Sequence, residues 1–196
     1  MIAIIDYKAG NLRSVENALK RLGAEYEVTS DPDRIRSASH VIMPGVGEAS
    51  SAMQSLREEG LIDVIKSLTQ PVLGICIGLQ LMCRMSEEGN TPCLGIFSPS
   101  VRRFTEVPGV KIPHMGWNTI TGLRGPLFEG IPDGSFVYYV HSFRPDLDES
   151  QTIAVTEYGA DRYSGALCKG NFYGTQFHPE KSGPVGARIL KNFIEL

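Results

Sequence analysis

The sequence predicts an α/β fold in three layers, with a mostly parallel central sheet flanked by helices and extended by added antiparallel strands. In the first half of the chain, short apolar runs alternate with stretches in which apolar residues recur at helical spacing. After Glu88 the pattern changes to shorter segments punctuated by Gly and Pro, which is typical of hairpins. Because the 196 residues show no internal repeat and no linker, we expect a single domain over 1–196.

Turn and cap residues separate the predicted elements of the first half. Asn11 can cap the first helix and Gly23 can end it, while Asp31-Pro32 suits an N-cap followed by proline at the first helical position. The strands are expected at 2–5, 26–28, 41–43 and 72–73, and the helices at 12–22, from Pro32 onward and at about 49–68.

The second half predicts antiparallel strands and hairpins added to the sheet, followed by a closing helix at about 185–194. That helix places Ile189, Leu190 and Phe193 on one side. The candidate strands are 117–120, 136–140, 152–156, 165–169 and 172–177.

Composition excludes several classes of protein. Hydrophobic residues make up 42% and charged residues 21%, as in an ordinary soluble globular chain. The net charge is −3 and Lys and Arg are scattered, so no nucleic-acid partner is expected. No apolar run approaches a membrane span, and the start Met-Ile-Ala-Ile-Ile-Asp lacks the basic region of a secretory signal. We therefore expect no membrane association and a cytoplasmic protein with reduced thiols.

One cysteine stands where an apolar run becomes a helical pattern. Cys76 lies between Gly74 and Gly78, and Gly-x-Cys-x-Gly has the spacing of a nucleophile elbow at a strand-to-helix turn. On its own the motif fits a buried core thiol equally well. The remaining cysteines have no elbow context and no C-x-x-C pair, so we expect structural thiols and no metal site at Cys83, Cys93 and Cys168.

A cysteine nucleophile needs a base, and His178 has the most suitable context among the four histidines. It follows an apolar strand in Gln176-Phe-His-Pro-Glu180. In an extended segment, residues two apart point the same way, so His178 and Glu180 should share a face. A carboxylate there could fix the imidazole tautomer, as the third group of a catalytic triad does. Taken alone, His-Pro-Glu also fits a surface turn.

Acyl transfer further requires hydrogen-bond donors aimed at the oxyanion. The backbone N–H of Ile77 follows the nucleophile at the start of a predicted helix and is one candidate. A second could come from the Pro44-Gly-Val-Gly47 loop, at the carboxyl end of a neighbouring strand, where open α/β sheets place their ligands. The two glycines of this loop also fit an ordinary tight turn.

Together, these motifs resemble those of class I, triad-type glutamine amidotransferases over essentially the whole chain. Within that family the chain is most similar to the glutaminase subunits of imidazole glycerol phosphate synthases. The motifs that carry the resemblance are Pro44-Gly-Val-Gly47, Gly74-Ile-Cys-Ile-Gly-Leu-Gln80, Pro113-His-Met-Gly-Trp-Asn118, Tyr138-Tyr-Val-His-Ser142 and Gln176-Phe-His-Pro-Glu-Lys-Ser182.

The resemblance implies hydrolysis of L-glutamine to glutamate and ammonia through a cysteinyl thioester, without a metal or an organic cofactor. It makes Cys76 the nucleophile, His178 the general base and acid, and Glu180 the group that orients His178. For His141 a structural cap after the strand remains an alternative. The implied substrate contacts are the side chain of Gln80, the backbone of His141, Ser142 and Phe143, and Gly47 at the opposite side.

The resemblance also implies a partner, a (β/α)8-barrel cyclase that forms a heterodimer with this chain and uses the ammonia in histidine biosynthesis. Trp117 and Asn118, in a predicted Gly-Trp-Asn turn, would be exposed groups of the kind that interfaces favour. Lys181 and Asn11 join them by resemblance alone. The alternative for Trp117 is ordinary burial in the core.

The chain departs from the family pattern at two places, Glu48-Ala49-Ser50-Ser51 and Gly95-Ile-Phe-Ser98, and the first bears on the geometry of the Gly47 loop. A self-contained cysteine hydrolase of the γ-glutamyl kind would share the elbow but would not require the Gly-Trp-Asn motif. A glutaminase for anthranilate, aminodeoxychorismate or guanine-nucleotide synthesis would share the triad. A non-catalytic binding subunit would not need an intact triad.

Overall fold

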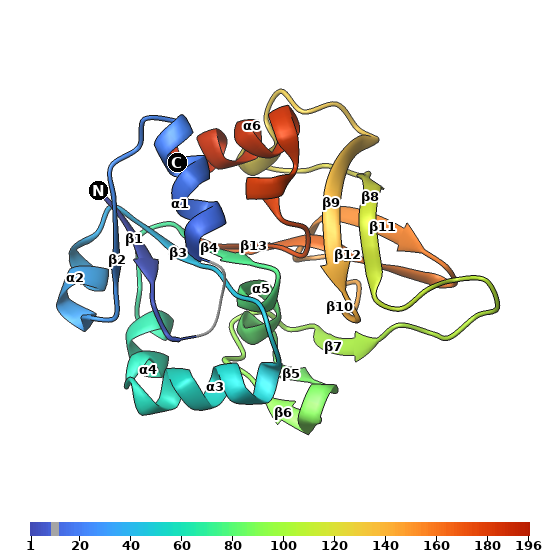
Figure 1. Ribbon diagram of the computed structural model, residues 1–196, viewed down its shortest axis with the longest axis horizontal. Coiled ribbons are helices and arrows are strands. Elements are labelled where there is room, and N and C mark those ends of the chain that lie inside the picture. Colours follow the sequence, from blue (N-terminus) through green and yellow to red (C-terminus); the bar gives the residue numbers. More distant parts are fainter. Residues whose placement is uncertain (9–11) are drawn as a thin grey trace.

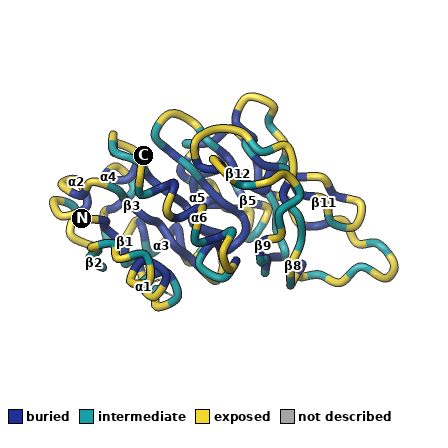
Figure 2. Tube along the Cα trace, turned by 90° about the horizontal axis from the view of Figure 1, so that it is seen from above, coloured by how far each residue is buried: buried dark blue, intermediate teal, exposed yellow. Residues whose placement is uncertain are grey.

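The computed structural model describes residues 1–8 and 12–196, so Asn11, the predicted helix cap and partner contact, lies outside the described residues. The described chain folds into three layers around a central sheet (Figure 1). Buried backbone runs through the middle of the molecule at β1, β3 and α5, and exposed loops surround it (Figure 2). The three-layer α/β fold predicted from the sequence is therefore confirmed.

The central sheet has seven strands in the order β11-β12-β13-β4-β3-β1-β2. The five strands from β13 to β2 are parallel, and β12 and β11 add an antiparallel edge. We had predicted the strand at 172–177 as an antiparallel addition; it pairs antiparallel with β12 but parallel with β4. The strands are β1 (Ile2–Ile5), β2 (Tyr26–Thr29), β3 (His40–Met43), β4 (Val72–Ile75), β11 (Thr152–Tyr158), β12 (Asp161–Lys169) and β13 (Phe172–Thr175).

Each face of the sheet buries its own apolar cluster, because successive strand residues point to opposite faces. Ile2 and Ile4 of β1 pack under α1 (Leu12–Arg21) and α6 (Gly183–Ile194), whereas Ala3 and Ile5 face the other side. In Figure 1, α1 and α6 lie above the sheet and α3, α4 and α5 below it. The helices of that second face are α2 (Pro32–Ser37), α3 (Ala49–Glu58), α4 (Leu61–Lys66) and α5 (Ile77–Met82).

The helix predicted over about 49–68 is two helices, so that prediction was wrong in one respect. Gly60 adopts a left-handed conformation, with φ of 67°, and breaks the helix between α3 and α4. Leu61 and Ile65 are nevertheless buried, as the apolar stripe predicted. A glycine inside a helical pattern is only a weak signal that the helix ends. Here the helix does end at Gly60, and α4 starts as a separate helix.

Two smaller sheets lie beside the central one. The hairpin of β8 (His114–Ile120) and β9 (Ser135–His141) forms its own two-stranded sheet and is joined to the main sheet by a bridge between Thr121 and Val155. We had predicted these strands as additions to the main sheet. The second small sheet has four strands and was not predicted from the sequence. Its strands, in order, are β10 (Phe143–Pro145), β7 (Ser100–Arg103), β5 (Met85–Ser86) and β6 (Thr91–Pro92).

Short 3-10 turns complete the described chain at η1 (Glu88–Asn90), η2 (Pro126–Phe128) and η3 (Pro179–Lys181). Within the described ranges, every helix is too short or too polar to cross a lipid bilayer.

Candidate active site

Cys76 sits at the turn between β4 and α5 in a backbone conformation that non-glycine residues rarely adopt, with φ of 54° and ψ of −106°. The two glycines of the motif are required by close packing. A Cβ on Gly78 would lie 1.9 Å from the carbonyl oxygen of Met43, and a Cβ on Gly74 would lie 2.7 Å from the backbone of Gly78. The glycines thus let α5 approach the sheet and hold Cys76 in its strained turn.

His178 reaches Cys76 because β13 runs parallel to β4 as its immediate neighbour. Thr175 pairs with Ile75, and the Cys76 N–H donates to the Thr175 carbonyl at 2.8 Å. The carboxyl ends of the two strands therefore meet at one edge, where open α/β sheets bind ligands. The backbone N–H of His178 donates to the backbone carbonyl of Tyr138 in β9 at 2.9 Å, which fixes the chain just after β13.

The His178 imidazole is paired with Glu180. Nδ1 lies 2.8 Å from Glu180 Oε1, and the two side chains are only 3% and 4% exposed. Because a carboxylate accepts, Nδ1 carries the proton and Nε2 is left for chemistry. We had expected an extended segment to align the two residues; instead the 3-10 turn η3 brings Glu180 back under His178.

Charge interactions decide the protonation of His178. Burial alone would lower its pKa, but the neighbouring Cys76 sulfur and the Glu180 carboxylate outweigh burial and raise the pKa to about 10. In the described structure Nε2 and Glu180 Oε2 are buried without a hydrogen-bond partner. His178 can therefore hold a proton beside Cys76, with Nε2 free to pass it to a bound group.

A pocket of about 330 Å³ opens at this edge of the sheet and brings most of the predicted site residues together. Glu180 is not among the lining residues and acts from behind His178. The pocket is lined by Val46, Gly47, Cys76, Ile77, Gln80, Glu88, Pro113, Val140, His141, Ser142, Phe143 and His178.

The predicted oxyanion loop lies over this pocket and is held from below by Tyr7. The buried Tyr7 hydroxyl donates to the Pro44 carbonyl at 2.5 Å. Gly45 packs against Ile77, the first residue of α5, and Gly47 has a φ of 111°. The loop and the start of α5 thus face the pocket together. Tyr7 was not predicted as a site residue, because its partner Pro44 is 37 residues away in the sequence.

Gln80 is buried, and its amide nitrogen is committed within the chain. Nε2 donates to the Phe143 carbonyl at 2.9 Å and to Gln176 Oε1 at 3.0 Å. Gln176 Nε2 in turn lies 3.8 Å from Cys76 Sγ. Gln80 therefore links the pocket wall at Phe143, through Gln176, to Cys76, and only its carbonyl oxygen is left for a ligand.

Glu88, also missed from the sequence, adds a carboxylate to the pocket wall. Oε2 accepts the Ala49 N–H at the start of α3 at 2.8 Å, and burial raises the pKa of Glu88. It follows the predicted helices in a polar stretch that carries no local signal of function.

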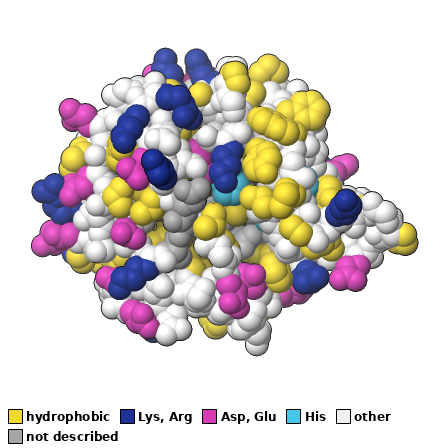
Figure 3. Space-filling model, viewed as in Figure 1, with side chains coloured by type: hydrophobic (Ala, Val, Ile, Leu, Met, Phe, Trp, Pro, Cys, Tyr) yellow, Lys and Arg dark blue, Asp and Glu magenta, His cyan; other side chains and the backbone are white. Residues whose placement is uncertain are grey.

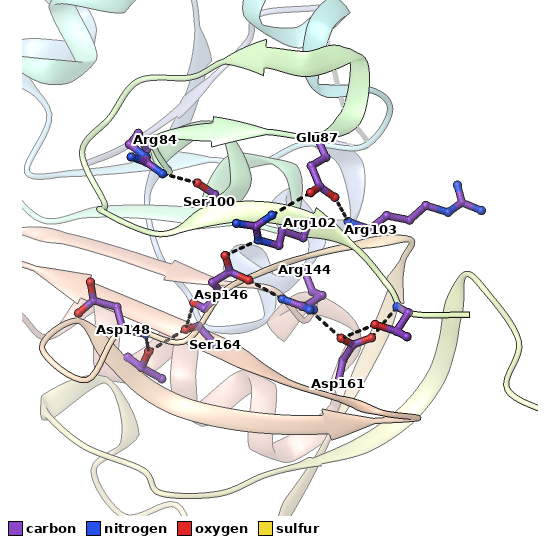
Figure 4. A network of polar contacts seen from close by, with 12 residues as sticks. Arg84, Glu87, Ser100, Arg102, Arg103, Arg144, Asp146, Asp148, Asp161 and Ser164 are labelled. Carbon is purple, nitrogen blue, oxygen red and sulfur yellow. Dashed lines mark hydrogen bonds and ion pairs between the residues drawn. The ribbon is translucent and has the colours of Figure 1, made fainter. Parts of the chain in front are cut away.

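The backbone of β10 behind Phe143 is fixed by ion pairs (Figure 4). The Arg144 guanidinium bridges Asp146 and Asp161, each at 2.6 Å, and Asp161 is only 5% exposed. Arg102 of β7 continues the network to Asp146 and to Glu87, next to Glu88. Two walls of the pocket therefore share one supporting network.

The hairpin presents an apolar patch on its outer surface, formed by Met115, Trp117 and Phe136, which are 64%, 56% and 58% exposed. Hydrophobic side chains gather over β8 and β9 in the space-filling view (Figure 3). Trp117 is thus exposed, but the predicted Gly-Trp-Asn turn is wrong, because these residues belong to strand β8.

The Asn118 amide donates to the Glu157 carbonyl at 2.9 Å, and Lys181 lies half-buried beside Glu180.

The chain belongs to the class I glutamine amidotransferases, because the family model "Glutamine amidotransferase class-I" matches residues 3–196. It is 56% identical to the imidazole glycerol phosphate synthase subunit HisH of Bacteroides fragilis, covering 100% of this chain and 99% of that one. It is 48% identical to the subunit of the same name from Haemophilus influenzae, with coverages of 99% and 96%. The family resemblance seen in the sequence is therefore confirmed.

Solved structures agree in fold. A glutamine amidotransferase crystal structure superposes with a TM-score of 0.75 at 20% identity, covering 100% of this chain and 98% of that one. A glutamine amidotransferase from Thermotoga maritima gives a TM-score of 0.64 at 22% identity, with coverages of 99% and 80%.

Proposed function

We propose that this chain is the glutaminase subunit of an imidazole glycerol phosphate synthase and acts as a single glutaminase domain in histidine biosynthesis. The observation that carries the chemistry is the pocket in which Cys76, His178 and the Gly47 loop meet. The relatives from Bacteroides fragilis and Haemophilus influenzae support the pathway, because they match over nearly their full length and bear this subunit's name.

The reaction starts from the Cys76 thiolate beside protonated His178. The thiolate attacks the side-chain amide carbon of glutamine, and the C=O electron pair moves onto oxygen. Nε2 of His178 gives its proton to the nitrogen, ammonia leaves, and a thioester remains. Water then attacks the thioester carbon while Nε2 takes up a proton, and glutamate leaves as the thiolate is restored. Only groups of the chain and water take part.

Backbone N–H groups stabilise the oxyanion in both steps. The Ile77 N–H, at the start of α5, is one donor, and an N–H of the Gly47 loop is the other. Each donor that is correctly placed contributes about 2.7–4 kcal/mol to the transition state. Tyr7, through Pro44, sets the position of the loop.

The amino-acid end of the substrate binds between two walls of the pocket. The backbone of His141, Ser142 and Phe143 holds the α-carboxylate, and the Glu88 carboxylate faces the α-ammonium group. The orientation places the side-chain amide toward Cys76. Gln80 holds the wall at Phe143 in place and offers its carbonyl oxygen.

The ammonia passes to a (β/α)8-barrel cyclase bound as a heterodimer, with the patch of Met115, Trp117 and Phe136 at the interface. Exposed aromatic and methionine side chains gathered on one surface are typical of interface cores. Lys181 and Asn118 are further proposed contacts with the cyclase. We also propose a cytoplasmic location, with which the four free cysteines are consistent.

The test is a glutamine hydrolysis assay of wild type, Cys76→Ala and the control Cys168→Ala, each with and without a barrel cyclase. We expect Cys76→Ala to abolish hydrolysis and Cys168→Ala to retain it. Hydrolysis that survives Cys76→Ala contradicts the mechanism. Association with an anthranilate-type synthase in place of a barrel cyclase overturns the pathway but not the chemistry.

A further inference from the structure

A buried chain of hydrogen bonds runs from the hairpin to the wall of the glutamine pocket. His114 and His141 stand opposite one another in β8 and β9, and Tyr163 of β12 lies between them. The Tyr163 hydroxyl is 3.2 Å from His114 Nδ1 and 3.3 Å from His141 Nε2. His141 Nδ1 is 2.8 Å from the Phe143 carbonyl. The catalytic steps above use none of these three side chains.

Both imidazoles are neutral, so the direction of every bond in the chain is fixed. Burial lowers the pKa of His141 to about 3 and that of His114 to about 4. Because a carbonyl only accepts, His141 Nδ1 must carry the proton, and its Nε2 must accept. Tyr163 therefore donates to His141, and its oxygen is left to accept from His114 Nδ1.

The hydrogen-bond chain continues from His114 to Asn118 in β8. With its proton on Nδ1, His114 has a bare Nε2, which lies 3.5 Å from the amide nitrogen of Asn118. The orientation of this amide is fixed because Asn118 Oδ1 accepts the Thr119 N–H at 2.7 Å. Donors and acceptors thus alternate without conflict from Asn118 to Phe143. The stacking of His114 against Tyr158 and Tyr139 holds the ring in the chain.

At the pocket, this chain of hydrogen bonds ends on the carbonyl of Phe143. The Phe143 oxygen accepts from His141 and from Gln80, which fills both of its lone pairs and fixes the plane of that peptide. His141, Ser142 and Phe143 form the wall that faces the substrate. Tyr163 never touches the pocket, yet it sets the orientation of the wall through His141.

We infer that Tyr163 is a positioning residue for glutamine binding, which orders the His114–Tyr163–His141 chain and thereby holds the backbone wall at Phe143. The inference rests on the proposed glutaminase function. Because the wall binds the unreacting end of the substrate, loss of the chain should weaken ground-state and transition-state binding equally. The expected signature is a raised KM with an unchanged kcat.

The test compares Tyr163→Phe with Tyr158→Phe in complex with the cyclase. Tyr158 belongs to the same aromatic cluster, but its hydroxyl donates to the Lys111 carbonyl and not to the chain. We expect Tyr163→Phe to raise KM for glutamine on the order of tenfold, with kcat within about twofold of wild type, and Tyr158→Phe to change neither.

A KM for Tyr163→Phe equal to that of Tyr158→Phe, or a loss in kcat alone, overturns the inference. If wild type itself does not hydrolyse glutamine, the proposed function fails instead. Nitrogen-15 NMR of histidine in the wild-type protein tests the chain without any variant. Both His114 and His141 should be neutral with the proton on Nδ1, and a proton on Nε2 of either ring contradicts the assignment.

Discussion

The Cys76 N–H donates to the Thr175 carbonyl at 2.8 Å, and this bond joins the ends of two strands through residues that are 99 positions apart in the sequence. It places Cys76 and the segment that carries His178 side by side at one edge of the sheet.

Replacing Glu180 with Gln should lower the pKa of His178 from about 10, because the buried carboxylate is one of the two groups that hold its proton. We expect kcat to fall on the order of 10²-fold, as loss of general acid–base assistance does. The pKa is measured by NMR titration of His178 in both proteins, and an unshifted titration contradicts the role of Glu180.

The same pair should make stability depend on pH. The pKa of His178 is 6.5 in the unfolded chain and about 10 in the folded protein, so its protonation stabilises the folded state. This stabilisation is complete below pH 6.5 and is lost as the pH rises to about 10. The free energy of unfolding should therefore separate wild type from Glu180→Gln most at pH 6 and least above pH 10. Urea denaturation across this range measures the difference.

Replacing Gly78 with Ala should displace the nucleophile, because the new Cβ would lie 1.9 Å from the Met43 carbonyl oxygen. We expect a loss of unfolding free energy of about 1–3 kcal/mol, together with most of the activity. Gln54→Ala on the exposed face of α3 is the control and should change little. A Gly78→Ala protein with wild-type stability would show that α5 can move away from the sheet.

Replacing Arg144 with Met should destabilise the fold by about 3–5 kcal/mol, because the buried Asp161 would lose its cation. The exposed Arg162–Glu157 pair provides a control, and Arg162→Met should cost at most about 1 kcal/mol. The double variant Arg144→Met/Asp161→Asn should recover part of the loss. Equal losses from the two Arg variants would mean that burial of the network adds nothing.

Replacing Trp117 with Ala should weaken binding of the cyclase by about 2 kcal/mol or more, because a large exposed aromatic side chain at an interface centre is a typical hot spot. Glutamine hydrolysis by the isolated chain should be unchanged, since Trp117 does not line the pocket. Calorimetric titration with the cyclase checks the affinity. Lys66→Ala, an exposed residue of α4 on the opposite face of the sheet from α1, is the control and should leave the affinity unchanged.

The sequence predicted those parts of the site that local spacing determines. Cys76 between two glycines and Glu180 two residues after His178 are short-range patterns, and the structure brings all three residues together. Their catalytic roles stay predictions. The apolar runs likewise predicted β1, β3 and β4, because strands buried on both faces are continuously hydrophobic.

The features that the sequence did not reveal depend on distant neighbours. β13 pairs antiparallel with β12, which precedes it closely in the chain, and parallel with β4, which lies about a hundred residues earlier, so the second pairing is not visible in the local pattern. Tyr7 and Glu88 gain their roles from contacts with Pro44 and Ala49, which are 37 and 39 residues away. The rings that stack on His114 belong to Tyr139 and Tyr158, which lie on other strands, so the pattern of β8 alone does not show them.

The position of β13 has a consequence for synthesis of the protein. This strand lies inside the sheet between β4 and β12, although it comes near the end of the chain. A growing chain on the ribosome therefore carries the thiol of Cys76 long before it carries the imidazole of His178. Cys76, the proposed nucleophile, therefore stays without its proposed base until β13 has joined the sheet, and we expect the unfinished chain to hydrolyse no glutamine.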